Sequence, residues 1–214
     1  MERSRKVGLA ITGLLLAFVA TFLIVYSGSF ASNDTSGFFE LNGLSSSQSI
    51  ADLAVAVTYF GSELILVPLA GLFYLLSKTK KLETAFVVVL AVVVSDIVLF
   101  VLKTAYVRQR PSLVLNGVIL PIGPDSGSSF PSGHTTRAFA VASLVSLRMG
   151  RRYAFSLVVA IGVALSRVII GVHFPLDVVG GALLGLILGL VVYEHGPRVY
   201  RYVIPKLFPG RQIP

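Results

Sequence analysis

The chain has 214 residues, of which 55% are hydrophobic and only 13% are charged, and this composition excludes an ordinary soluble domain. We therefore expect an integral membrane protein. The net charge of +8 does not indicate a nucleic-acid partner, because the basic residues form short clusters between apolar segments. Cysteine is absent, which excludes disulfides and thiolate chemistry, and the scattered histidines and carboxylates do not suggest a metal site.

Six segments are predicted to cross the bilayer: 7–26, 50–76, 82–106, 134–149, 153–170 and 174–194. The first could also be a signal peptide, but its apolar core is longer than a usual one and we favour an uncleaved span. Residues 28–49 are rich in serine, glycine and asparagine and lack lysine and arginine, so we expect a loop on the translocated side. Residues 108–129, with several prolines and glycines, are predicted to form a polar loop.

The predicted fold class is all-α, a single domain over residues 1–214 built as a bundle of six transmembrane helices. The fourth span carries many small residues, which is typical of a helix that packs against protein rather than lipid. In the sixth span, Gly181, Gly185 and Gly189 recur every four residues. This spacing allows a neighbouring helix to approach closely.

The distribution of lysine and arginine predicts the orientation in the membrane. Thirteen of the eighteen lie at the amino terminus, in the turns after the second and fourth spans, or in the carboxy-terminal tail, so we expect both termini in the cytoplasm. The other five lie at or near span ends that face the opposite side, which indicates another role for them. They are Lys103, Arg108, Arg110, Arg137 and Arg167.

Span parity places the end of the third span, the start of the fourth, the end of the fifth and the start of the sixth on one extracytoplasmic face. Cations at the edge of a hydrocarbon bundle are costly unless they meet an anion. Lys103, Arg110 and Arg167 would together place about three positive charges around a group of phosphate size. Ser132 and Gly133, at a helix start, can add hydroxyl and backbone N–H donors.

Two histidines accompany these cations. His173 and Asp177 are four residues apart, so on a helix that starts near Pro175 they share a face and the carboxylate can orient the imidazole. An oriented imidazole can act as a nucleophile or a base. If His173 attacks phosphorus, His134 can give the leaving group a proton and then help to activate water.

These residues form three motifs: Lys103-x6-Arg110-Pro111, Pro131-Ser132-Gly133-His134 and Ser166-Arg167-x5-His173-x3-Asp177. They resemble the signature motifs of the type 2 phosphatidic acid phosphatase (PAP2) superfamily, which includes bacterial lipid phosphatases and undecaprenyl diphosphate phosphatases. All eleven signature letters match in order, within residues 103–177.

The resemblance implies that His173 is the nucleophile that forms a phosphohistidine, that Asp177 orients it, and that His134 is the general acid. It implies no metal and no cofactor. The expected substrate is a membrane lipid phosphomonoester or a lipid (polyprenyl) diphosphate, hydrolysed on the extracytoplasmic side of the cell membrane. The residues that would bind its phosphate are Lys103, Arg110, Ser132, Gly133 and Arg167.

Five other polar residues keep open roles at this point. Arg137 either extends the anion site toward a second phosphate or pairs with an acidic side chain. Arg108 is a rim residue or a headgroup contact. Glu63 and Asp96 lie within predicted spans, where ionisable groups are often functional but can also bond to a neighbouring helix. His195, at the cytoplasmic end of the last span, is interpreted as an interface residue.

Two other functions compete with lipid hydrolysis. A lipid phosphotransferase would use the same histidines with an acceptor other than water. A non-catalytic protein that binds or transports an anionic lipid would use the cations alone, and that hypothesis leaves His134 and the pairing of His173 with Asp177 without a task. The oligomeric state and the identity of the lipid are left open by the sequence.

Overall fold

The computed structural model describes residues 2–77 and 81–208, and every regular element within these ranges is helical. Lys78, Thr79, Lys80 and Arg211, which belong to two of the predicted cytoplasmic basic clusters, lie outside the described residues. The elements are α1 (Glu2–Ser27), α2 (Ala31–Asn42), η1 (Gly43–Ser46), α3 (Gln48–Thr58), η2 (Tyr59–Gly61), α4 (Glu63–Leu76), α5 (Lys81–Ala105), α6 (Pro111–Val114), α7 (Gly133–Met149), η3 (Arg151–Tyr153), α8 (Phe155–Ile169) and α9 (Pro175–Leu207).

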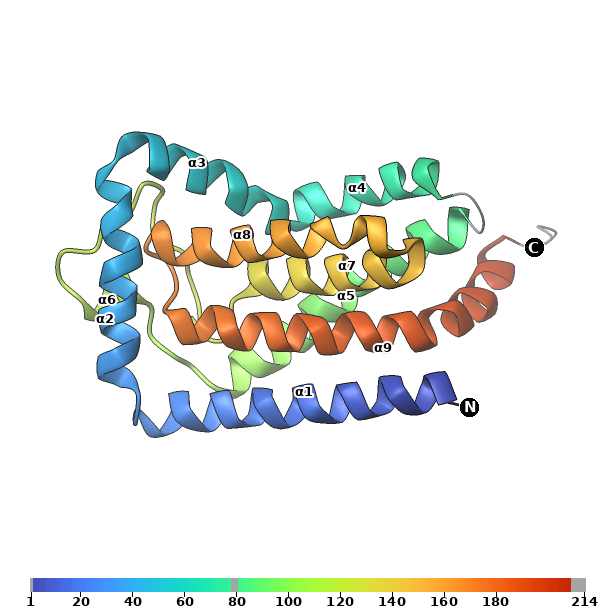
Figure 1. The fold of residues 1–214 in the computed structure, drawn as a ribbon, viewed down its shortest axis with the longest axis horizontal. Helices are drawn as coiled ribbons and strands as arrows, with labels where there is room; N and C mark the ends of the chain where they lie inside the picture. The colour runs from blue at the N-terminus through green and yellow to red at the C-terminus, as the bar shows by residue number, and fades with distance from the viewer. Residues whose placement is uncertain (1, 78–80, 209–214) are drawn as a thin grey trace.

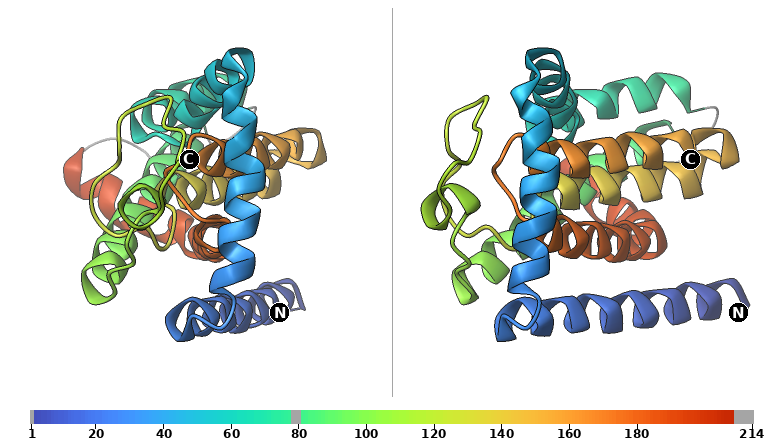
Figure 2. Two further views of the ribbon diagram at one scale, coloured as in Figure 1. Left: turned by 90° about the vertical axis from the view of Figure 1, so that its left-hand side faces the viewer. Right: turned by 60° about the vertical axis from the view of Figure 1, so that its left-hand side comes forward.

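The long helices run side by side, and α7 packs against α5, α8 and α9 (Figure 1). The start of α1 and the end of α9 lie at the same end of the bundle. The short helix α2 crosses the opposite end, and two further views place the loop between α6 and α7 at that end as well (Figure 2). We call this end, which holds α2 and the 115–132 loop, the loop end of the bundle.

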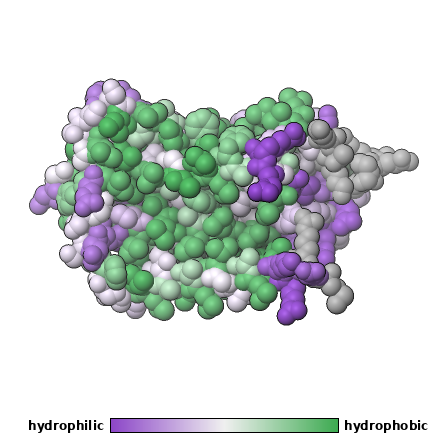
Figure 3. Space-filling view, viewed as in Figure 1, coloured by the Kyte–Doolittle hydropathy of each residue, from purple (hydrophilic) through white to green (hydrophobic). Residues whose placement is uncertain are grey.

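The surface supports the prediction of a multi-pass membrane protein. An apolar belt lies between two more polar ends of the molecule (Figure 3). Four helical segments of the described chain are long and apolar enough to cross a membrane: Ser4–Ser27, Lys81–Ala105, Arg151–Ile169 and Pro175–Leu207. A fifth span is obtained if α3 with η2 and α4, which meet at a bend of 62°, count as one. At 17 residues, the predicted fourth span, α7, is shorter than a usual span, and it is largely buried by its neighbours.

The predicted loop at 28–49 is wrong, because most of this segment is helical. Its composition is polar, but Asp34, Phe38 and Asn42 follow one another at intervals of four residues and form the buried face of α2. Phe38 is fully buried and packs against the ring of Phe174, with 5.6 Å between ring centroids. Tertiary contacts with the bundle thus stabilise a helix that local hydrophobicity does not indicate.

Two further span boundaries differ from the prediction. The predicted second span is broken at Ser62, whose extended backbone (φ −80°, ψ 141°) ends η2 and whose hydroxyl accepts the Leu64 N–H at 3.2 Å to cap α4. The last helix continues beyond residue 194 to Leu207.

The prediction that the glycine row permits close packing is confirmed, since a Cβ at Gly181, Gly185 or Gly189 would collide with the backbone or side chains of α7.

Candidate active site

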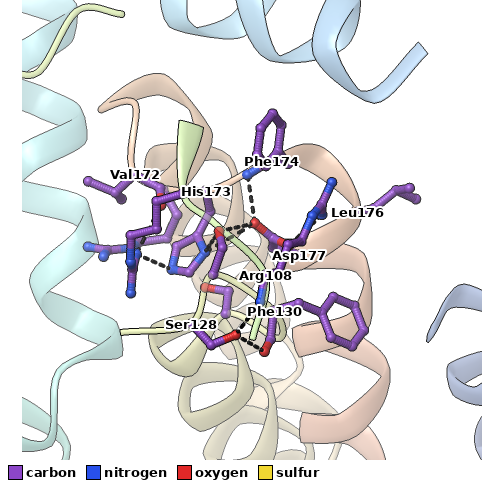
Figure 4. A network of polar contacts seen from close by, with 12 residues as sticks. Arg108, Ser128, Phe130, Val172, His173, Phe174, Leu176 and Asp177 are labelled. Atoms are coloured by element: carbon purple, nitrogen blue, oxygen red, sulfur yellow. Dashed lines mark hydrogen bonds and ion pairs between the residues drawn. The ribbon is translucent and has the colours of Figure 1, made fainter. Parts of the chain in front are cut away.

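The three motifs meet at the loop end of the bundle. Between α8 and α9 the chain reverses at Gly171, whose φ of +82° suits glycine and where a Cβ would collide with the Ile119 carbonyl. Pro175 then occupies the first turn of α9. This short connection holds His173 at the loop end and places Asp177 one turn inside α9, with the two side chains directed toward each other (Figure 4).

The hydrogen bonds of His173 define the protonation of its ring. Arg110 Nη1 lies 3.4 Å from His173 Nε2, and because a guanidinium can only donate, Nε2 is the unprotonated nitrogen. Nδ1 therefore carries the hydrogen and faces two acceptors, Asp177 Oδ2 at 3.4 Å and Ser129 Oγ at 3.3 Å. The Nε2 lone pair consequently points toward the cationic side of the site.

The carboxylate of Asp177 is held by four donors in all. Oδ2 accepts the Phe174 N–H at 2.8 Å and the Ser129 hydroxyl, in addition to the His173 ring. Oδ1 accepts from Arg108 Nη1 at 2.6 Å. Because both oxygens are bonded, Asp177 cannot rotate away from His173 without losing several charge-assisted hydrogen bonds.

Arg108 connects this carboxylate to α2. Its Nη2 donates to Asp34 Oδ2 at 2.6 Å, and its guanidinium lies 4.4 Å from the centroid of the Phe174 ring. Asp34 also accepts the Leu176 N–H at 2.8 Å, in the first turn of α9. Burial disfavours the charged guanidinium, but the carboxylates of Asp177 and Asp34 outweigh burial and raise the pKa of Arg108.

The imidazole of His173 is neutral at physiological pH. Burial lowers the pKa of His173 to about 3 and the nearby guanidiniums of Arg167 and Arg110 act in the same direction, whereas Asp177 opposes the shift without cancelling it. A neutral ring whose Nε2 is unprotonated has the form that a nucleophile requires.

Arg110 is fixed from several sides. Its Nη1 donates to the Val172 carbonyl at 2.9 Å, its Nη2 to the Ser126 carbonyl at 2.9 Å and its Nε to the Gly127 carbonyl at 3.1 Å. Burial lowers the pKa of Arg110 from its ordinary value although Asp125 and Asp177 oppose this shift. The guanidinium is thereby held in one orientation beside the His173 ring.

A carboxylate lies between the two arginines of the predicted anion site. Asp125 Oδ2 accepts from Arg110 Nη1 at 3.3 Å and also from Arg167 Nη2. Arg167 donates through Nη1 to the Thr58 hydroxyl at 2.9 Å. Its Nε is buried without a hydrogen-bond partner among the described residues, which leaves one donor of this cation available.

The remaining predicted phosphate ligands lie around this pair. Lys103 Nζ donates to the Ser128 carbonyl at 2.6 Å. Ser132 is the N-cap of α7, and its hydroxyl accepts from Thr135 Oγ1 at 3.0 Å. Gly133 is the first residue of α7, so its N–H belongs to the unpaired amide groups of a helix start.

His134 follows on the same first turn of α7. It lies within electrostatic range of Arg167, Arg137 and His173. Gly61 of η2 packs directly on it, since a Cβ at Gly61 would collide with the His134 carbonyl and its Cβ. The structure thus brings both predicted histidines to one site.

Arg137 lies one turn further along α7 and pairs with two acidic side chains. Its Nη1 is 2.6 Å from Asp96 Oδ1 and its Nη2 is 2.8 Å from Glu63 Oε2, while Nε donates to the Gly61 carbonyl at 3.1 Å. Of the two interpretations left open for Arg137, this structure displays the pairing. Both carboxylates that lie in predicted spans are partners of the same cation.

Four residues of the network were missed or underestimated by the sequence analysis. Arg108 is a half-buried bridge between two carboxylates rather than a rim residue. Ser129, Asp34 and Asp125 were not singled out. Ser129 lies two residues before the second motif, and Asp34 is the first of the residues spaced by four on α2. Neither feature identifies a partner that is distant in sequence.

An apolar cavity of about 250 Å³ lies between α4, α7 and α8. Phe60 of η2 lines it near the break in the second span, and Ala138 lines it one helical turn below His134. From these residues the cavity extends along α4 as far as Leu76, within the apolar belt.

Comparison with known proteins identifies the family of this chain. A family model described as the PAP2 superfamily matches residues 84–201. The chain is 34% identical over 146 residues to the bacitracin transport permease protein BcrC of Bacillus licheniformis, covering 67% of this chain and 72% of that one. It is 28% identical over 179 residues to the undecaprenyl-diphosphatase of Sulfolobus acidocaldarius, covering 80% and 84%.

Solved structures agree as well. The fold is similar to that of a transmembrane PAP2-type phosphatidylglycerolphosphate phosphatase from Bacillus subtilis, with a TM-score of 0.75, 23% identity and coverage of 90% of this chain and 98% of that one. The resemblance seen in the motifs is confirmed, and the chain belongs to the PAP2 superfamily.

Proposed function

We propose that the protein is an integral membrane phosphatase that removes the terminal phosphate of a lipid phosphomonoester or a polyprenyl diphosphate through a phosphohistidine intermediate. The observation that carries this proposal is the position of His173. Its unprotonated Nε2 faces the Arg110 guanidinium at 3.4 Å while Nδ1 is directed to Asp177. A phosphate held by the arginines would present its phosphorus to that lone pair.

The reaction needs two proton transfers, and His134 is the group we assign to both. As Nε2 of His173 forms a bond to phosphorus, the bond to the leaving oxygen breaks and that oxygen takes a proton from His134. Burial and the guanidiniums of Arg167 and Arg137 disfavour protonated His134, and the negative charge of the bound phosphate offsets them in this step. Neutral His134 then accepts a proton from water as the water oxygen attacks the phosphohistidine. Phosphate leaves, Nε2 recovers its lone pair, and His134 is again protonated.

The cations would stabilise the charge that develops on the phosphate oxygens. We assign this role to Lys103, Arg110 and Arg167, together with the Ser132 hydroxyl and the Gly133 N–H. Preorganised donors of this kind commonly provide the largest share of such catalysis. The unpartnered Nε of Arg167 supports the assignment, because a bound phosphate oxygen would satisfy it.

We also propose the membrane arrangement that the sequence predicts. It has six spans in one domain, with α3 and α4 forming one broken span and α7 enclosed by the others. Both termini lie in the cytoplasm and the loop end of the bundle faces the extracytoplasmic side. The clusters of lysine and arginine support this orientation, since positive residues are enriched in cytoplasmic loops.

A lipid substrate is supported by the apolar cavity, whose lining residue Ala138 lies one helical turn from His134. One relative is named an undecaprenyl-diphosphatase and another a transport permease. Transport alone would not need Asp177 to hold the His173 ring with its lone pair toward the cations, so we favour hydrolysis. Transfer to an acceptor other than water would use the same residues.

We propose that no metal takes part, because the positive charges around the phosphate are side chains of the protein. In the ranges 2–77 and 81–208, no group of three or more His, Asp or Glu side chains is placed to hold a metal ion.

The test of the proposed function is phosphate release by purified protein from a panel of lipid phosphomonoesters and polyprenyl diphosphates, with and without EDTA. Release from at least one lipid and full activity in EDTA are expected. Restoration by a divalent ion after inhibition would contradict the mechanism.

A further inference from the structure

Asp125 occupies the position where the proposed substrate phosphate would bind. It is the carboxylate shared by Arg110 and Arg167. Only 5% of the Arg110 side chain and 2% of the Arg167 side chain are exposed, whereas 37% of the Asp125 side chain is. The anion therefore lies at the open side of two buried cations.

Two buried guanidiniums this close together require a negative charge, because unpaired buried charges are strongly destabilising. Asp125 supplies it from within the chain. Arg167 nevertheless retains the unpartnered Nε, so a single carboxylate does not saturate the donors of the site. A phosphate group, with three oxygens available, can satisfy more of them than a carboxylate.

The backbone around Asp125 is fixed while its side chain is not enclosed. The carbonyls of Ser126 and Gly127 accept hydrogen bonds from Arg110, and that of Ser128 accepts from Lys103. Residues 115–132 form no helix or strand. The carboxylate can therefore leave the two arginines by rotation of its own side chain, without movement of the anchored backbone.

We propose that Asp125 is a built-in competitor of the substrate, which occupies the anion site in the free protein and is displaced when a terminal phosphate binds. This inference rests on the proposed function. A phosphomonoester carries about −1.5 to −2 charges at neutral pH. When it replaces the carboxylate, the arginines meet both more negative charge and more acceptor oxygens. A phosphodiester carries one negative charge and gains little by the exchange.

The consequence concerns the lipids that surround the protein. Bulk phospholipids are phosphodiesters and are present at far higher local concentration than any phosphomonoester intermediate. Because a ligand must displace the Asp125 carboxylate, only a ligand that binds the two arginines tightly can occupy the site. Bulk headgroups then leave the site free, and a terminal phosphate still enters it.

Binding of two water-soluble probes to the purified protein tests this directly. The probes are inorganic phosphate at about pH 8, which is mainly a dianion, and dimethyl phosphate, which keeps a single charge. Calorimetry compares the wild type with Asp125→Asn, and with Ser126→Ala as the control that leaves the charge unchanged. Displacement of Asp125 costs the same free energy for either probe. Asp125→Asn is therefore expected to increase the affinity for both probes by a similar factor, about tenfold or more. Ser126→Ala should change neither.

Three results would overturn the inference. Weaker phosphate binding in Asp125→Asn would make Asp125 a part of the binding site. Unchanged binding of both probes would show that it does not compete. A much larger increase in affinity for phosphate than for dimethyl phosphate would show that Asp125 stays beside the bound anion and repels it. If Asp125→Asn does not purify as a folded protein, Asp125→Ser removes the same charge and is measured in its place.

Binding of the probes is independent of turnover, so the inference and the proposed function can fail separately. Absence of phosphate release from every lipid by the wild type would contradict the proposed function alone. Where turnover is measurable, vesicles with increasing phosphatidylglycerol should inhibit Asp125→Asn more strongly than the wild type. Equal inhibition of the two proteins would contradict the role of Asp125.

Discussion

The guanidinium of Arg108 joins the carboxylate of Asp177 at 2.6 Å, and through its second nitrogen it reaches Asp34 on α2 at the same distance. Helix α2 lies across the loop end of the bundle and is far from Asp177 in sequence (Figure 1). The carboxylate that faces His173 is therefore positioned partly by a helix outside the three motifs.

The first prediction tests this connection. Asp34→Asn keeps the shape of the side chain but removes the charge that holds Arg108, so Asp177 and the His173 ring should lose their orientation. We expect kcat to fall roughly ten- to a hundredfold with little change in KM. Glu40→Gln, which removes an exposed carboxylate from the same helix, is the control and should behave as the wild type. A change confined to KM would contradict a positioning role.

The second prediction concerns the covalent step. His173→Ala removes the proposed nucleophile and should abolish turnover, while phosphate still binds through Arg110 and Arg167. Rapid quench with substrate labelled in the terminal phosphate should trap an acid-labile, base-stable phosphoprotein in the wild type. The same label retained by the His173→Ala protein would refute the assignment of the nucleophile.

The third prediction separates the two histidines. Loss of a general acid typically costs on the order of 10² to 10⁴ in rate, and the cost is greatest for a poor leaving group. A lipid alkoxide is a poorer leaving group than the lipid monophosphate released from a diphosphate. His134→Ala should therefore impair hydrolysis of a phosphomonoester more than that of a diphosphate. Equal defects on both substrates, measured as kcat/KM, would argue against His134 as the acid.

The fourth prediction is a pH dependence of stability. The pKa of His173 is lowered from 6.5 to about 3 by burial, so between these values the unfolded chain binds more protons than the folded one. Stability should consequently fall as the pH falls through this range. Thermal unfolding from neutral pH to about pH 4 should show a smaller loss of Tm in His173→Asn than in the wild type. If Tm fell with pH equally in both proteins, His173 would not be the cause of the pH dependence.

The fifth prediction tests the orientation in the membrane. The protein has no cysteine of its own, so a single introduced cysteine is the sole site for a thiol reagent. Cysteines at the exposed positions Ser36 and Asn116, both at the loop end, should react with an impermeant reagent in intact cells. A cysteine at Arg152, which is exposed in the turn between α7 and α8, should react only after the cells are opened. The reverse pattern would overturn the proposed topology.

Much of the fold could be predicted from the sequence because long apolar segments and basic turns are local signals. The glycine row on α9 is another such signal, since its spacing alone indicates one close-packed face. The helix α2 could not be predicted in this way. Its stability comes from Phe38 and Asp34 meeting α9 and Arg108, and those partners are more than 70 residues away in the chain.

The same distinction between local signals and distant contacts applies to the candidate site. The four-residue spacing of His173 and Asp177 predicted their pairing, and the two side chains do meet, but α9 begins at Pro175 and the turn that precedes it brings His173 beside Asp177. The donors that hold Asp177 in place, Ser129 and Arg108, come from loops whose path no periodic pattern describes. Asp125 is the clearest case, because only the folded loop brings its carboxylate between two arginines that lie 15 and 42 residues away.

The glycine row leaves no layer of side chains between α9 and α7. If α9 turned about its own axis, side chains larger than glycine would collide with the α7 backbone, so this close packing fixes the spacing of His134 from Asp177. The pair α7 and α9 is therefore the part of the candidate site that we expect to change least when a substrate binds. No such glycine row joins α3 to α4, which meet at a 62° bend, and we expect any movement that accompanies substrate binding to occur there rather than between α7 and α9.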